Sequence, residues 1–165
     1  WQMDTEAVAQ IFCDDILPIF DLTALWIGRV EQGGQLGVLA GAETGEENFI
    51  RHLQDSGLPQ PEAPPGKQPL ERAVHEGVRQ LLTLGGGEDD GFPWPMGATA
   101  ALVLPLLLRG KTWGTLVLYA REMQEFEGAH SNAGRLSDVA SRLAITLECA
   151  LQQEWLTLQI GRAHV

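Results

Sequence analysis

Hydrophobic residues recur at helical spacing at both ends of the chain. The first of these stretches is predicted to begin at an N-cap residue, Asp4 or Thr5, and to end at Pro18, because proline lacks the N–H that continues a helix. The second stretch, residues 131–159, would be roughly 40 Å long, so its far end should protrude from a small domain. The two apolar stripes are Val8, Ile11, Phe12 and Ile16 in the first helix, and Leu136, Val139, Ala140, Leu143, Leu147, Ala150 and Leu151 in the second.

Between these helices the apolar pattern is typical of β-strands. In the first strand, Leu25 and Ile27 alternate with Ala24 and Trp26, so both faces are apolar and the strand should lie inside a sheet. Gly33-Gly34 predicts a two-residue hairpin turn after it, because glycine adopts the positive φ angles that such turns need. The predicted strands are residues 22–30, 36–42, 78–84, 98–108 and 113–120.

Two short helices and two loops complete the pattern. A helix over residues 46–54 would bury Phe49, Ile50 and Leu53, and a helix over 69–76 would have Pro69 in its first turn and Gly77 as its terminator. Residues 59–66 and 85–97 are rich in proline or glycine and are predicted to be loops. The order of the elements predicts an α+β fold with a mostly antiparallel sheet of about five or six strands.

The charge balance and the cysteines exclude several classes of function. Eleven Lys and Arg against 22 Asp and Glu give a formal net charge of −11, which argues against nucleic acid as a partner. The longest apolar run, residues 98–108, is too short to cross a membrane, no signal peptide is evident, and a cytoplasmic location is expected. Cys13 and Cys149 lie in helical patterns and are predicted to be buried thiols. The four histidines lack the spacing of metal ligands, so neither a metal nor a cofactor is expected.

The two ends suggest that the chain is a piece of a longer protein. The second long helix looks unfinished, and residues 160–165 match the translation of a common sequencing adapter. We therefore predict a domain over residues 4–156, followed by the start of a linker and a non-native tail over residues 157–165.

A known family has the same sequence of elements. The string ALVLPLLLRGKTWGTLVLYAREMQEFE, followed by a long helix, resembles the end of a GAF domain. Upstream, LTALWIGRVEQGGQLGVLAGA resembles the family's first hairpin, PLERAVHEGVRQLL its middle helix and strand, and FPWPMGATAALVLPL its variable loop and fourth strand. The resemblance covers about residues 5 to 156, in order.

The resemblance implies a sensory domain without catalytic residues. It implies a GAF-like central antiparallel sheet, with the terminal helices on one face and a small-molecule cavity under short helices and loops on the other. Such domains regulate diguanylate cyclases, phosphodiesterases or histidine kinases, and this chain looks most similar to those of bacterial cyclic-di-GMP signalling proteins. The family's cyclic-nucleotide motif is missing, because Ala120-Arg121 and His130-Ser131 stand at its positions, and no Cys-His pair is present for a covalent bilin.

The resemblance also suggests candidate residues for the two functions of such a domain. Trp26, His75, Trp94 and Met96 are the candidates for ligand contact. For Trp26 the alternative is packing in the core, and for Trp94 it is a lid that fills its own pocket. On the last helix, Leu151, Trp155 and Leu158 are candidates for a homodimer interface that carries the signal, the alternative being a frayed helix end.

Two other classes of function remain open at this point. One is an enzyme similar to the GAF-type free methionine sulfoxide reductases, which need reactive cysteines near the pocket. The other is a structural dimerisation domain with a filled core.

Overall fold

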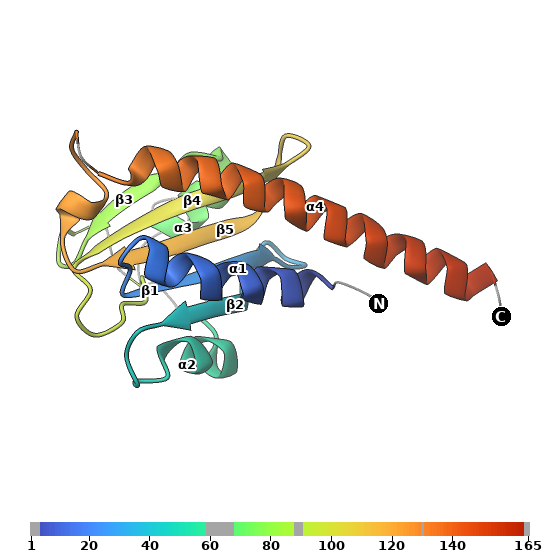
Figure 1. The fold of residues 1–165 in the computed structure, drawn as a ribbon, viewed down its shortest axis with the longest axis horizontal. Coiled ribbons are helices and arrows are strands. Elements are labelled where there is room, and N and C mark those ends of the chain that lie inside the picture. The colour runs from blue at the N-terminus through green and yellow to red at the C-terminus, as the bar shows by residue number, and fades with distance from the viewer. Residues whose placement is uncertain (1–3, 59–67, 88–90, 130, 164–165) are drawn as a thin grey trace.

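The structure is a computed structural model that describes residues 4–58, 68–87, 91–129 and 131–163, and it contains one five-stranded antiparallel sheet (Figure 1). The strand order is β2-β1-β5-β4-β3. The strands are β1 (Ala24–Val30), β2 (Leu36–Glu43), β3 (Gln80–Thr83), β4 (Ala100–Leu108) and β5 (Lys111–Ala120). The helices are α1 (Thr5–Ile19), α2 (Phe49–Ser56), α3 (Pro69–Glu76) and α4 (Ala133–Ala163), with a short 3-10 helix, η1 (Met123–Glu125), before α4. This arrangement confirms the predicted α+β fold.

The sheet separates two apolar clusters. Leu25 and Ile27 of β1 face α1 and α4, in one cluster with Leu136 and Leu143 of α4. Ala24 and Trp26 face the other way, in a second cluster with residues of α2 and α3 such as Ile50, Leu53 and Ala73. Strand β1 pairs with β2 on one side and β5 on the other, so the predicted interior strand with two apolar faces is confirmed.

The hairpin turns match the glycine signals, with one difference in length. Val30 pairs with Leu36, and the Glu31 N–H donates to the Gln35 carbonyl over 2.7 Å. The loop enclosed by this last bond is residues 32–34, which is three residues instead of the predicted two. Gly33 and Gly34 both have positive φ, as predicted. The β4–β5 turn is the pair Arg109-Gly110, both also at positive φ. Pro105 of β4 lies beyond the last pair with β3, which ends at Val103, so no neighbouring β3 residue pairs with it in register.

Two helix boundaries differ from the prediction. Helix α1 does not end at Pro18 but contains it and ends at Ile19. Pro18 lies in the last turn, where it removes a single hydrogen bond of the helix. Phe20, the residue after the helix, is buried in the core, so packing stabilises the helix beyond the proline. Helix α2 begins at Phe49 instead of residue 46, after Asn48 in the left-handed conformation. Helix α3 has Pro69 at its start and Gly77 as its left-handed C-cap, as predicted.

Helix α4 extends well beyond the sheet (Figure 1). It continues without a break to Ala163, so the predicted start of a linker at residue 157 lies inside a helix. Where α4 leaves the domain, the Glu154 carboxylate accepts hydrogen bonds from the Thr5 N–H and hydroxyl at 2.6 and 2.7 Å, which joins α4 to the start of α1. No helix in the described part of the chain is long and apolar enough to span a membrane.

The two cysteines differ in exposure. Cys13 lies on the buried side of α1, and burial, with a smaller contribution from the Asp14 carboxylate, raises the pKa of its thiol to about 12. Cys149 is exposed on α4, so the prediction that both thiols are buried is wrong for this residue. Cys149 precedes the buried Ala150 in the sequence. Consecutive residues of a helix point in different directions, so Cys149 faces solvent while Ala150 faces the core.

Candidate functional site

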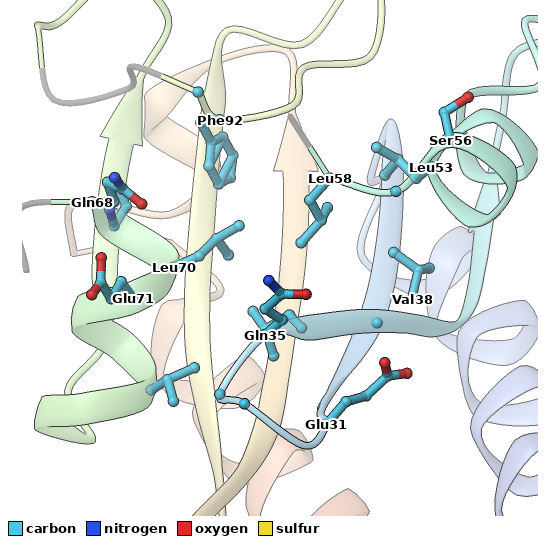
Figure 2. A pocket seen from close by; sticks show the side chains of 18 of the residues that line it. Glu31, Gln35, Val38, Leu53, Ser56, Leu58, Gln68, Leu70, Glu71 and Phe92 are labelled. Carbon is cyan, nitrogen blue, oxygen red and sulfur yellow. The ribbon is translucent and has the colours of Figure 1, made fainter. Parts of the chain in front are cut away.

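A cavity of about 700 Å³ opens on the face of the sheet opposite α1 and α4 (Figure 2). Its walls come from three places in the chain: the β1–β2 hairpin, the end of α2 with the residues that follow it, and α3. Gly91 and Phe92 close one end. A volume of this size is within the range of small-molecule sites.

The hairpin contributes one polar wall. The turn holds Glu31, whose N–H and carbonyl bind Gln35 and Gly34 respectively. The Glu31 side chain lies over Gly37, where a Cβ atom would overlap the carboxylate. Gly37 therefore makes room for a carboxylate at the edge of the cavity.

Helix α3 contributes the opposite wall. Pro69 at its first position is buried against the domain and sets where the helix begins. Glu71 follows in the first turn, with 28% of its side chain exposed, and the His75 Nε2 atom lies 3.8 Å from its carboxylate. Of the four predicted ligand residues, His75 is the one that lines this cavity.

Trp26 lies in a buried aromatic cluster beside the cavity. Its Nε1–H donates to the Tyr119 hydroxyl over 2.9 Å, and that hydroxyl donates to the Pro93 carbonyl over 2.8 Å. Burial raises the pKa of Tyr119 above its ordinary value, partly opposed by the hydrogen bond from Trp26. Trp26 is completely buried, which is the core packing named as the alternative for this residue.

The other two predicted ligand residues follow in the loop after Gly91. Trp94 is half-buried and packs edge-on against Phe92 and Tyr119, with ring centroids 5.2 and 5.9 Å away. Its Nε1–H is buried and has no hydrogen-bond partner among the described residues. Met96 is 76% exposed and does not line the cavity, although its N–H donates to Glu47. Phe92 connects this loop to the cavity, since it both lines the cavity and contacts Trp94.

The three predicted interface residues lie on one side of α4, at positions i, i+4 and i+7. Leu151 is half-buried, while Trp155 and Leu158 are each 62% exposed. A second apolar groove runs between α1 and α4, lined by residues such as Val8, Phe12, Val139 and the exposed Ile11.

Sequence reasoning missed the two carboxylates of the cavity. Glu31 belongs to a hairpin turn and Glu71 to a helix start, and both positions ordinarily hold solvated acids. No spacing rule connects them, because the hairpin and α3 meet only in the folded chain. Among the described residues, no group of three His, Cys, Asp or Glu is placed to hold a metal ion.

The family model described as a GAF domain matches residues 2–148. The chain is a GAF domain. The family is generally sensory or regulatory, so the coarse function expected from the sequence is supported. A comparison with curated proteins finds no match.

Several solved structures have a fold similar to that of this GAF domain. It is similar to the GAF-B domain of DevS from Mycobacterium smegmatis, with 16% identity, a TM-score of 0.67 and coverage of 93% of this chain and 99% of that one. It is equally similar to free methionine-R-sulfoxide reductase from Neisseria meningitidis, with 16% identity, a TM-score of 0.68 and coverage of 90% and 81%. A domain from Sinorhizobium meliloti, described as part of a two-component sensor histidine kinase protein, matches with 15% identity, a TM-score of 0.60 and coverage of 93% and 96%. At these identities the comparisons establish the fold alone.

Proposed function

We propose that this GAF domain is a regulatory input domain that binds a small molecule in the cavity between the hairpin and α3. The observation that carries the proposal is the position of the cavity, on the opposite face of a single sheet from α1 and α4. A ligand bound there would contact a sheet whose other face packs against α1 and α4. We also propose, as expected from the sequence, that the sensory domain spans residues 4–156 and that it is cytoplasmic.

Two hydrogen bonds join a strand of the cavity's hairpin to α1. The side-chain amide of Gln10 in α1 donates to the Gly41 carbonyl of β2 over 2.8 Å and accepts from the Gly41 N–H over 3.4 Å. Strand β2 also contributes Leu36, Gly37 and Val38 to the cavity wall. A ligand that favours one position of β2 would therefore favour one position of α1, to the extent that it binds the two positions with different affinity.

Ligand binding is tested by filling the cavity. Val38 points into it (Figure 2) and lies in a strand, where an aromatic side chain is well accommodated. We expect a compound found by a thermal-shift screen of the wild-type domain to lose its effect on the melting temperature in Val38→Trp. Val78→Trp is the matched control, because Val78 is 45% exposed and does not line the cavity. Equal binding by Val38→Trp, or no ligand from a broad screen, would contradict the proposal.

The output would pass through α4 in a homodimer. Leu151, Trp155 and Leu158 form an apolar stripe on the C-terminal half of α4, and Trp155 and Leu158 follow Glu154, where the helix leaves the domain. A second copy is the occupant that suits this stripe, because two such helices would bury identical apolar faces against each other. Continuation of α4 would then carry the signal to an output domain, for which we propose a diguanylate cyclase or a phosphodiesterase.

Dimerisation is tested by placing a charge in the stripe. We expect the wild-type chain to sediment as a dimer at micromolar concentration and Trp155→Glu to sediment as a monomer, because an unpaired carboxylate in an apolar interface keeps its desolvation cost. Gln153→Glu is the control, since Gln153 lies on the other side of α4 and the change in charge is the same. A wild-type monomer, or a dimer in both variants, would overturn this interface.

Two alternatives have different support. A histidine kinase as the output domain is compatible with the same cavity and helix. A methionine sulfoxide reductase needs a reactive thiol at the pocket, but Cys13 lies in the cluster under α1, across the sheet from the cavity, and Cys149 is exposed on α4. Neither thiol lines the cavity, and the raised pKa of Cys13 disfavours the reactive thiolate, so the regulatory function is the better supported one.

A further inference from the structure

The charged groups that line the cavity are of one sign. Glu31 and Glu71 lie on opposite walls (Figure 2), and the described lining residues include neither lysine nor arginine. His75 is the remaining titratable group of the lining, and it lies beside Glu71 with 64% of its side chain exposed. A phosphate or carboxylate group in this space would meet two carboxylates and, among the described lining residues, no fixed positive charge.

Glu31 is an exposed residue of the hairpin, and its carboxylate is unpaired among the described residues. The hairpin turn holds its backbone through the bonds to Gln35 and Gly34, and Gly37 leaves the space in which the side chain lies. Among the residues that the structure describes, none forms a hydrogen bond or ion pair with this carboxylate. It is therefore an acceptor that a bound group with N–H donors would satisfy.

Apolar side chains also line the cavity, beside the polar Gln35, Ser56 and Gln68. Val38, Leu58, Leu70 and Phe92 extend into it from β2, the segment after α2, α3 and the loop before β4 (Figure 2). A ligand that satisfies these walls needs a hydrocarbon body in addition to its polar group.

We propose that the cavity binds a small organic cation, an ammonium or guanidinium group on a short apolar body, with Glu31 and Glu71 as the groups that recognise the charge. This inference rests on the proposed small-molecule function and names the chemical class of its ligand. It predicts that cyclic nucleotides and other phosphate esters bind this cavity more weakly than the cation, and it leaves the nature of the output domain unchanged.

The test uses compounds with the same ring and a side chain of similar length that differ in the charge of their polar group. One set is phenethylamine, 2-phenylethanol and phenylacetate, and the other is 2-cyclohexylethylamine, 2-cyclohexylethanol and cyclohexylacetate. Isothermal titration of the whole chain at neutral pH should show binding of at least one amine, with its alcohol about tenfold weaker and its carboxylate not bound, since the cation alone forms ion pairs with the carboxylates in addition to hydrogen bonds.

Variants then assign the recognition to the two carboxylates. Glu31→Gln and Glu71→Gln keep the shape and remove the charge, and each should weaken amine binding about tenfold while leaving the alcohol unaffected. Glu127→Gln makes the same change in net charge on an exposed residue outside the cavity and should have no effect. Melting temperatures of the three variants show whether each one is folded.

Different results would overturn the proposed ligand class and the proposed function. Unchanged amine binding in both cavity variants, tighter binding of an alcohol or a carboxylate, or no binding by either amine would overturn the cation proposal. If an alcohol or carboxylate binds instead and Val38→Trp abolishes that binding, the cavity is still a ligand site and the proposed function stands. If the broad screen also finds no ligand, both proposals fail.

Discussion

Replacing Gly114 with alanine should destabilise the domain by about 3 kcal/mol or more, the largest effect expected from so small a change. Gly114 of β5 pairs with Arg29 of β1, the last pair between these two interior strands. A Cβ atom there would overlap the Gly28 carbonyl oxygen and would lie 3.1 Å from its carbon and 3.3 Å from the Arg29 Cα atom. These are backbone atoms of a paired strand, so rotation of a side chain cannot relieve the overlap.

The measurement is urea unfolding, with Gly134→Ala as the matched control. Gly134 lies in the first turn of α4, has ordinary helical φ, and a Cβ atom on it would meet nothing within 4 Å. The same substitution there should stabilise the domain by about 0.5–1 kcal/mol, because alanine loses less backbone entropy than glycine in a helix. A wild-type midpoint for Gly114→Ala would contradict the close approach of β1 and β5.

Trp26→Ala should cost about 3–5 kcal/mol, the range for removing a large buried aromatic side chain. Trp26 is 0% exposed, and its indole fills the space between β1 and the aromatic cluster of Phe49, Phe92, Trp94 and Tyr119. The substitution also removes the hydrogen bond that Trp26 donates to Tyr119. The free energy of unfolding from urea titration measures this loss.

Tyr119→Phe separates the hydrogen bonds from the packing. It keeps the ring and its edge-on contact with Phe49 at 5.5 Å, but it leaves the Trp26 N–H and the Pro93 carbonyl without partners. The expected cost is about 1–3 kcal/mol, smaller than that of Trp26→Ala. Faster proteolysis of the loop at Pro93 should accompany it, since that bond holds the loop to β5. A cost equal to that of Trp26→Ala would show that the hydrogen bonds, instead of packing, dominate the cluster.

The aromatic cluster and the cavity divide one face of the sheet between them. Phe92 belongs to both, because it lines the cavity and its ring centroid lies 5.2 Å from that of Trp94 and 5.9 Å from that of Tyr119. Trp26 and Trp94 belong to this cluster and do not line the cavity, and their contact with a ligand stays a prediction. The open volume lies instead toward the hairpin and α3, where the charged side chains are.

Local patterns alone were enough to predict most of the fold. The alternation of Leu25 and Ile27 with Trp26 identified an interior strand, and Gly33-Gly34 and Gly110 identified the two hairpins. Pro69 and Gly77 bounded α3 at the correct residues. These signals are reliable because strand alternation, turn conformation and helix ends each depend on a few consecutive residues.

The site depended on contacts between distant segments, which no local pattern contains. Glu31 and Glu71 face one cavity only because the hairpin and α3 pack on the same face of the sheet. Trp94 and Met96 lie in one short loop, yet one packs on Tyr119 and the other is exposed to solvent. Residue type and periodicity therefore determined which elements form and which faces are apolar, whereas packing between elements decided where the sheet face is filled and where it stays open.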